Sequence, residues 1–294
     1  MLDRVTPWLS IVGIGEDGLA GLTPAARALV DDAELFIGGE RHLAMLPQDA
    51  RERLAWPSPL SALLDEIDSR RGTRVCVLAS GDPLWYGVGI SLLRRIPRNE
   101  IAILPGRSAF SLAAARLGWS LAEVDCLTLH GRPLSLLHPY LQPGAKLLVL
   151  SENASTPAAV AGLLCERGYG ASEIVVLEHL DGEKERVVEG VAADWSANDI
   201  ADLNTIAVAC TAGPDAMLLP RSAGLPDEQG RYEDAAAARA WLAEREGILP
   251  ADIVLMGRSL GAAVMVDLAA REGTRGLILE SAFTSLPRRC KSSK

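Results

Sequence analysis

A short turn of glycine, aspartate and proline follows an apolar run in the first half of the chain. Val75–Leu78 is apolar and mostly β-branched, as is typical of a buried strand, and Ser80–Pro83 interrupts it. Gly81 permits backbone conformations closed to other residues, and Pro83 fixes φ and removes a donor. Because open α/β sheets bind ligands at the carboxyl ends of their strands, this turn is a candidate binding site. The Asp82 carboxylate can support a cationic ligand, or it can accept amides within its own turn.

A second glycine-rich loop, Gly13–Gly18, matches the GxGxxG spacing of dinucleotide-binding proteins. In those proteins the third glycine opens a helix, and an acidic residue for the ribose ends the next strand. Here the loop continues to Thr23, the predicted helix cap, and the next strand ends at Gly38–Gly39. A nicotinamide oxidoreductase is therefore the least favoured interpretation, and these glycines can equally serve as turns.

Strands and helices alternate around these loops, which predicts an α/β fold whose first sheet is mostly parallel. Two closely spaced strands around Asp181–Gly182 indicate a hairpin, and hence a mixed second sheet. We expect domains at 1–118, 119–226 and 227–294. Strands are predicted at 8–14, 31–37, 75–78, 100–104, 126–129, 146–150, 174–177, 186–189, 203–210, 253–256 and 276–280, and helices at 24–33, 58–70, 90–95, 108–117, 134–141, 156–167 and up to about 271 in the last domain.

Composition narrows the class of protein. The chain has 294 residues, is 49% hydrophobic and 23% charged, and carries a net charge of −9. This acidic balance argues against nucleic-acid and anionic-membrane partners. The five cysteines are scattered without CxxC or Cys/His spacing, so we expect no metal site and a reducing cytoplasm. No apolar run approaches 18 residues, and the N-terminus lacks the apolar core of a signal peptide.

Six segments occur in a characteristic order. They are GIGEDGLAGLTPAARALVDDAELFIGGERHL, VCVLASGDPLWYGVG, LPGRSAFSLAAARLGW, LTLHGRP, LLVLSENASTPAAVAGLL and LNTIAVAC. Together they resemble the tetrapyrrole methylases, the S-adenosylmethionine (SAM) enzymes of cobalamin and sirohaem synthesis. GGERHL and LHGRP are similar, more narrowly, to the N-terminal, C5-methylating half of the precorrin-6Y C5,15-methyltransferase (decarboxylating) type. The resemblance covers roughly residues 8–226.

The resemblance implies a two-domain α/β fold with SAM in the cleft between the halves, a precorrin substrate methylated at C5, and a homodimer. It also implies that the C15-methylating and decarboxylating domain is missing. The cofactor-binding residues that it implies are Gly81, Asp82, Pro83, Ser108, Ala109, Ala207, Val208 and Ala209, and the substrate-binding residues are Gly13, Gly15, Arg41, Arg107 and Arg132.

Methyl transfer from a sulfonium needs in-line placement against an electron-rich carbon, without a metal or a covalent nucleophile. Within the resemblance, Asp82 and His130 are the candidate catalytic residues. His130 ends a strand, where it either exchanges a proton with the methylated macrocycle or bonds to a loop carbonyl. Precorrins carry many carboxylates, which makes Arg41, Arg107 and Arg132 candidate clamps. A single arginine is more often a solvated surface residue.

The last 68 residues resemble a fragment of an α/β-hydrolase instead. Gly257–Gly261 reads GRSLG between a predicted strand and a helix, which is the context of a nucleophile elbow. A serine nucleophile needs a base, and no histidine follows His179. We therefore expect Ser259 to be inert. The change of resemblance near 225–229 predicts a chimeric or frame-shifted gene product. The alternatives are a serine hydrolase that uses Ser259 and a catalytically dead SAM- or tetrapyrrole-binding remnant.

Overall fold

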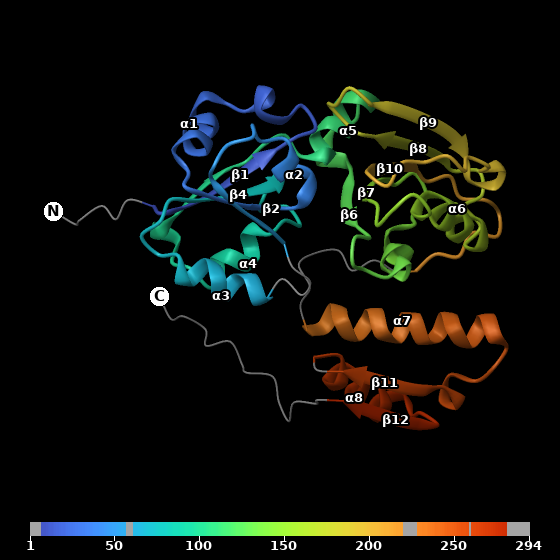
Figure 1. Cartoon of the computed structure of the whole chain (residues 1–294). Coiled ribbons are helices and arrows are strands. Elements are labelled where there is room, and N and C mark those ends of the chain that lie inside the picture. The colour runs from blue at the N-terminus through green and yellow to red at the C-terminus, as the bar shows by residue number, and fades with distance from the viewer. Residues whose placement is uncertain (1–6, 57–60, 220–227, 259, 281–294) are drawn as a thin grey trace, which may run out of the picture. The chain divides into compact units, whose positions relative to one another are not determined.

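The apolar runs of the first half form a parallel sheet with helices on both faces. A computed structural model describes residues 7–56, 61–219, 228–258 and 260–280 (Figure 1). The chain divides into two compact units: unit 1 is 1–136 with 143–215, and unit 2 is 137–142 with 216–294. The first sheet of unit 1 has the order β3-β2-β4-β1-β5 with every pair parallel. Its strands are β1 (Leu9–Ile14), β2 (Leu35–Gly38), β3 (Glu52–Ala55), β4 (Val75–Ser80) and β5 (Ile101–Leu104).

Helices bury the two faces of this sheet in separate cores. One core takes Ile11 and Val77 from the strands with side chains from α3 and α4, and the other takes Val12 and Leu78 with side chains from α1 and α2. Figure 1 shows these two pairs of helices on opposite sides of the sheet. The helices are α1 (Pro24–Asp32), α2 (Glu40–Ala44), α3 (Ser61–Ser69) and α4 (Gly89–Leu93).

The second sheet of unit 1 is mixed, as the sequence predicts. Its order is β6-β7-β10-β8-β9; β6 and β7 run parallel, and the other neighbours are antiparallel. The strands are β6 (Asp125–Thr128), β7 (Lys146–Leu150), β8 (Glu173–Glu178), β9 (Arg186–Val191) and β10 (Asn204–Ala209). Two helices accompany them, α5 (Ala109–Leu117) and α6 (Thr156–Glu166). Although α5 precedes Gly118, its side chains Phe110 and Ala114 pack on the second sheet.

Most predicted elements appear within a few residues of the expected bounds. Thr23 caps α1 by accepting a hydrogen bond from the Ala26 amide, and Pro24 opens the helix. Residues 134–140 form a 3₁₀ helix in place of the predicted α-helix, and Pro139 lies inside it, where it cannot donate. The sequence analysis missed α2 and β3, because elements of five and four residues are too short to show a period. The other short 3₁₀ segments are Gly18–Gly21, Arg98–Glu100, Leu121–Glu123, Ala192–Asp194 and Pro250–Asp252.

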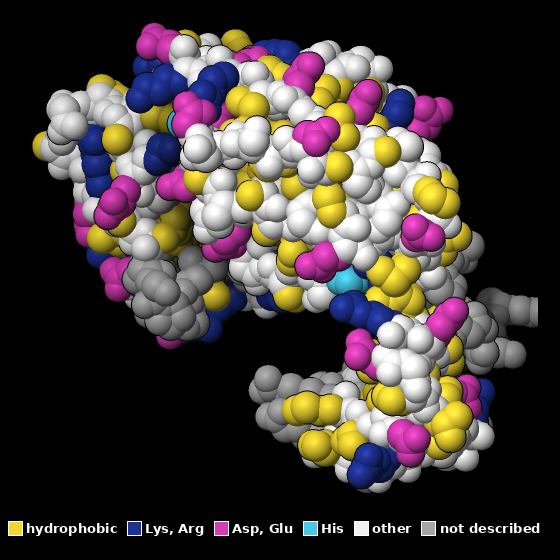
Figure 2. Space-filling view, turned by 90° about the vertical axis from the view of Figure 1, so that its right-hand side faces the viewer, with side chains coloured by type: hydrophobic (Ala, Val, Ile, Leu, Met, Phe, Trp, Pro, Cys, Tyr) yellow, Lys and Arg dark blue, Asp and Glu magenta, His cyan; other side chains and the backbone are white. Residues whose placement is uncertain are grey.

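Unit 2 contains one small α/β layer. Strands β11 (Val254–Arg258) and β12 (Gly276–Glu280) pair in parallel, and the connection between them is α8 (Leu260–Glu272). The long helix α7 (Glu228–Glu246) precedes them. Leu255 and Leu268 lie in a small core with Ala243, whereas the Met256 side chain is exposed. Figure 2 shows apolar and charged side chains interspersed on the face of the described residues that it presents.

No helix in the described part of the chain is both long and apolar enough to cross a membrane. Likewise, no group of three or more His, Cys, Asp or Glu side chains within the described residues is arranged to hold a metal ion.

Candidate functional site

The topology of the first sheet creates a point where the connections of two adjacent strands run in opposite directions. From β1 the chain crosses to β2 on one side, and from β4 it crosses to β5 on the other, while β1 and β4 are neighbours. Parallel sheets bind ligands at such a switch point, beyond the carboxyl ends of the strands. The two loops that leave this point begin with Gly15–Glu16 and Gly81–Asp82.

Three glycines allow these loops to approach at backbone distance. A Cβ on Gly13 would lie 1.8 Å from the Gly81 carbonyl oxygen and 2.2 Å from the Gly106 amide nitrogen. The Gly81 amide donates to the Ile14 carbonyl at 3.1 Å, and the Gly106 amide donates to the Gly81 carbonyl at 2.9 Å. Gly81 also has φ +52°, in the region that favours glycine. The residue types at these positions are therefore fixed by packing.

The turn of residues 80–83 meets the head of helix α5 directly. A Cβ on Gly81 would lie 2.8 Å from the Arg107 carbonyl oxygen and 3.1 Å from the Ser108 Cα. Ser108 is the N-cap of α5: it is buried, and its hydroxyl accepts a hydrogen bond from the Ser111 amide at 3.1 Å. The other amides of the first turn of α5 provide donors for an anionic or polar ligand group.

A cavity of about 560 Å³ opens between the two sheets of unit 1 above this turn. Its wall joins loops of the first sheet to residues of the second. The lining consists of Ile14, Gly15, Glu16, Gly39, Arg41, His42, Trp56, Leu78, Ala79, Ser80, Gly81, Asp82, Trp85, Tyr86, Gly87, Val88, Arg107, Ser108, Ala109, Phe110, Leu112, Thr128, His130, Arg132, Leu150, Ser151, Leu177, His179, Leu180, Asp202, Leu203, Asn204 and Thr205.

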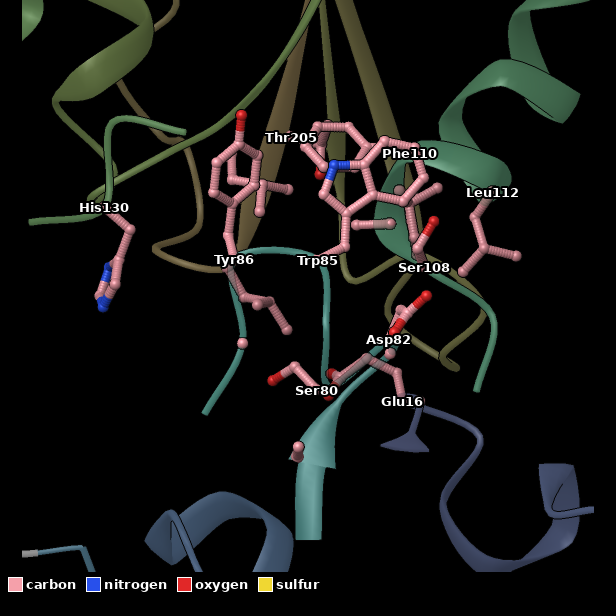
Figure 3. A pocket seen from close by; sticks show the side chains of 18 of the residues that line it. Glu16, Ser80, Asp82, Trp85, Tyr86, Ser108, Phe110, Leu112, His130 and Thr205 are labelled. Atoms are coloured by element: carbon pink, nitrogen blue, oxygen red, sulfur yellow. The ribbon is translucent and has the colours of Figure 1, made fainter. Parts of the chain in front are cut away.

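An aromatic cluster forms part of the wall. Figure 3 shows the Trp85 ring against Phe110 with Tyr86 beside them, and their ring centroids lie 4.9 Å and 6.2 Å from that of Phe110. Tyr86 has φ +59°, and its hydroxyl donates to the Cys126 carbonyl at 2.9 Å. This hydrogen bond ties the loop that follows β4 to strand β6 of the other sheet. The cluster therefore offers an apolar, aromatic surface to a ligand in the cavity.

Polar groups from the loops after β1, β2 and β4 form a connected network at the floor. The Arg41 guanidinium donates to one Glu16 carboxylate oxygen, to the His42 Nε2 at 2.9 Å and to the Ser80 hydroxyl at 3.1 Å. Burial, and then the charge of Arg41, lowers the pKa of His42 to about 4. Burial also lowers the pKa of Arg41. His42 is therefore neutral near pH 7, with Nε2 as the acceptor.

The three predicted clamp arginines all line the cavity, but their partners differ. Arg107 is paired with Asp17 and, at 2.6 Å, with Asp181, and Arg41 is paired with Glu16. Arg132 lies 5.3 Å from the Tyr86 ring centroid. Within the described residues Arg132 is the one of the three that has no carboxylate partner.

The other predicted site residues fall into two groups. Gly15, Gly81, Asp82, Ser108, Ala109 and His130 line the cavity, whereas Gly13, Pro83, Ala207, Val208 and Ala209 are not among its lining residues. Gly13 lies within β1 beneath the loops. Strand β10 enters the wall at its amino end, through Asn204 and Thr205, and not through the later alanines. Ala207 and Val208 are completely buried, and Ala207 lies in the core beneath α5.

Asp82 and His130 have contrasting local settings. One Asp82 carboxylate oxygen accepts the Leu84 amide at 2.9 Å, which is a bond within the turn itself. His130 has a side chain that is 75% exposed, and its Nδ1 lies 3.4 Å from a Glu152 carboxylate oxygen. In Figure 3 the His130 ring lies to one side, away from Glu16, Ser80 and Asp82.

Comparison with known sequences gives this architecture a family. The sequence model of the Tetrapyrrole (Corrin/Porphyrin) Methylases matches residues 9–195, which is more than half of the chain. The chain belongs to the tetrapyrrole methylase family. A solved member, the precorrin-6Y methylase from Archaeoglobus fulgidus, superposes with a TM-score of 0.54 at 29% identity, over 69% of this chain and 97% of that protein.

One relative of this tetrapyrrole methylase is longer than the chain, and another is shorter. It is 42% identical to the precorrin-6Y C(5,15)-methyltransferase [decarboxylating] of a Sinorhizobium species, over 85% of the chain and 62% of the relative. The chain thus spans less than two thirds of that longer protein. It is 34% identical to the cobalt-precorrin-7 C(5)-methyltransferase of Salmonella typhimurium, over 67% of the chain and 98% of the relative.

The sequence analysis left several lining residues of this tetrapyrrole methylase unassigned. Glu16 and His179 come from different sheets and meet across the cavity, and the Trp85 and Phe110 rings are in contact although they are 25 positions apart. The available signal was position, because Glu16 lies within the glycine-rich loop and His179 directly follows a predicted strand. Nothing in the sequence pairs them.

Proposed function

We propose that the chain is a SAM-dependent C-methyltransferase that methylates a precorrin at C5, without the C15-methylating and decarboxylating activity. The observation that carries this proposal is the cavity at the switch point, with the Gly81–Asp82 turn and the head of α5 side by side at its floor. The names of the Sinorhizobium and Salmonella relatives support it, since both include methylation at C5.

The residues around the turn fit a sulfonium cofactor. The Asp82 carboxylate supports the positive charge, and Gly81 together with the first-turn amides of α5, including that of Ala109, contacts the polar methionine part. The aromatic and apolar wall receives the adenine ring. SAM, when bound, supplies the electrophilic methyl group, and the protein places the acceptor carbon in line with it. Pro83, Ala207, Val208 and Ala209 support this site from behind the lining.

The acceptor lies toward the mouth of the cavity, near Gly15 and the Gly13 end of β1. Arg132 is the strongest candidate to bind a precorrin carboxylate, because no acidic side chain in the described residues compensates its charge. Arg41 and Arg107 bind substrate carboxylates only in exchange with Glu16, Asp17 or Asp181. His130 lies at the exposed rim, where it is a candidate acceptor for a proton of the methylated ring. A homodimer, as the family resemblance implies, and a cytoplasmic location, as the scattered cysteines predict, complete the proposal.

The test uses the whole chain with methyl-labelled SAM and a precorrin pool prepared with and without cobalt. We expect one SAM site per chain by calorimetry and a product heavier by one methyl group, with the label at C5. Arg132→Gln should raise KM for the tetrapyrrole while the calorimetric SAM affinity stays the same. Absence of SAM binding contradicts the proposal, and SAM binding without transfer identifies a catalytically dead remnant.

A second proposal concerns residues 227–294 of unit 2, which we assign to an α/β-hydrolase-like segment. The supporting observation is the close strand-to-helix turn: a Cβ on Gly257 would lie 2.6 Å from the Ala262 Cα and from the Gly261 carbonyl oxygen. The predicted nucleophile Ser259 lies outside the described residues. A fluorophosphonate probe tests the serine-hydrolase alternative. We expect no labelling, and labelling that disappears in Ser259→Ala would establish the hydrolase.

A further inference from the structure

His179 and Glu16 meet across the cavity although they belong to different sheets. Glu16 lies in the loop after β1, and His179 directly follows β8. The His179 Nδ1 lies 2.9 Å from a Glu16 carboxylate oxygen, and both residues line the cavity. Their side chains are 26% and 16% exposed, so the pair is largely shielded and yet open to a bound ligand. Figure 3 shows Glu16 near Ser80 and Asp82, at the floor.

The contact defines which ring nitrogen of His179 is free. A carboxylate only accepts hydrogen bonds, so the neutral imidazole carries its proton on Nδ1 and leaves the Nε2 lone pair available. In the part of the chain that the structure describes, the His179 Nε2 has no hydrogen-bond partner. The other Glu16 oxygen is held by the Arg41 guanidinium. Glu16 is thus fixed from both sides and orients His179.

The backbone around His179 is built for this contact. His179 has φ +45° and Asp181 has φ +68°, which lie in the left-handed region that residues other than glycine adopt uncommonly. The His179 amide donates to the Leu203 carbonyl at 3.1 Å, and the Gly182 amide donates to the His179 carbonyl at 2.9 Å. A Cβ on Gly182 would lie 2.7 Å from the Glu16 Cβ. Residues in such sparsely populated backbone conformations are kept there by the contacts around them, and they cluster at functional sites.

We propose that the His179 Nε2 is the base that removes a proton from the methylated macrocycle, and that Glu16 is its positioning residue. This inference rests on the proposed methyltransferase activity. When the macrocycle carbon attacks, a C–C bond forms, the S–CH₃ bond breaks and its electron pair stays on sulfur. The positive charge passes from the sulfonium to the macrocycle. Transfer of a ring proton to Nε2 neutralises the product and leaves an imidazolium beside the Glu16 carboxylate.

Two substitutions in the whole chain test the role of His179 as the base and of Glu16 as the residue that fixes its tautomer. His179→Asn removes the base and should lower kcat by about 100-fold or more, the usual contribution of a general base, with SAM affinity by calorimetry unchanged. Glu16→Gln places a side-chain amide, which can accept or donate, opposite Nδ1. It should lower kcat more than it changes KM. His138→Asn lies in the other unit and serves as the matched control, with an expected change below about twofold.

The spectroscopic readout does not require turnover. The chain has four histidines, so ring ¹⁵N spectra can be assigned by single substitutions. We expect the His179 ring to be protonated at Nδ1 in the wild-type chain and to lose this preference in Glu16→Gln. A wild-type chain that transfers no methyl group refutes the proposed function. An active wild-type chain with full kcat in His179→Asn, or with a larger loss in His130→Gln than in His179→Asn, overturns the inference alone.

Discussion

Strands β1 and β11 are both apolar runs that end near a glycine, and they differ in what surrounds them. All six residues of β1 are buried, because β4 and β5 flank it and helices cover both faces of the sheet. Among the described residues strand β11 has one paired neighbour, and its Val254 and Met256 side chains are 50% and 63% exposed. An apolar run therefore becomes a fully buried strand only when the fold supplies two neighbours and two covered faces.

The two units also differ in whether a glycine turn borders a binding cavity. Gly81 in unit 1 and Gly257 in unit 2 each allow a helix start or loop to approach at backbone distance. In unit 1, segments that follow all five parallel strands converge with residues of the second sheet beyond the turn and enclose a cavity. In unit 2 the described sheet has two strands. A glycine turn thus marks where a site can form, and the converging loops form it.

The largest expected loss of stability comes from placing a methyl group at the close backbone contact of Gly13 in unit 1. Gly13→Ala places a methyl group 1.8 Å from the Gly81 carbonyl oxygen, and we expect the free energy of unfolding to fall by at least about 3 kcal/mol. Gly162→Ala is the matched control: it lies in α6 with open space around it and should be neutral or stabilising by up to about 1 kcal/mol. Urea unfolding measures both variants, and hydrogen exchange should locate the loss in unit 1 peptides. A loss below about 1 kcal/mol for Gly13→Ala contradicts this packing.

The next effect depends on pH and also belongs to unit 1. Burial, and then Arg41, lowers the folded-state pKa of His42 to about 4 from 6.5. Between about pH 6.5 and pH 4, His42 is protonated in the unfolded chain but stays neutral in the folded chain. The free energy of unfolding therefore falls as the pH drops through this range. The full difference is about 3 kcal/mol. Unfolding titrations of the wild type and of His42→Gln measure it.

In His42→Gln the slope of stability against pH should flatten over that window. The peptides around β11 contain no histidine, and their hydrogen exchange should not share the step. An unchanged slope in the variant would assign the acid sensitivity to other groups.

The smallest expected changes in stability concern the sheet of unit 2, of which one face packs on a core and the other is exposed. Leu255 is 6% exposed and lies in the small core, so Leu255→Ala should cost about 2 kcal/mol. Its neighbour Met256 points to the other face, and Met256→Ala should change stability by less than about 0.5 kcal/mol. Hydrogen exchange of the β11 and β12 peptides measures the two variants side by side. Equal costs would show that another surface covers the outer face of this sheet in solution.

Local sequence predicted most elements of unit 1 because their signals are short-range. The Thr23 cap, the Ser108 cap and the left-handed Gly118 at the end of α5 follow from residue chemistry within a few positions. The 3₁₀ geometry of residues 134–140 and the edge strand β3 did not follow, because tertiary neighbours decide them. The same limit applied to the site. The predicted turn and helix head both line the cavity, whereas the wall from β10 comes from Asn204 and Thr205.

The amino-acid sequence by itself determined the glycine turns, the helix caps, the order of strands and helices and, through six ordered motifs, the family. The tertiary structure decided which side chains share one space. The pairing of Glu16 with His179, the packing of Trp85 against Phe110 and the acidic partners of Arg41 and Arg107 all join residues from separate elements. Such contacts depend on how strands, helices and the two sheets pack, and no local spacing in the chain encodes that.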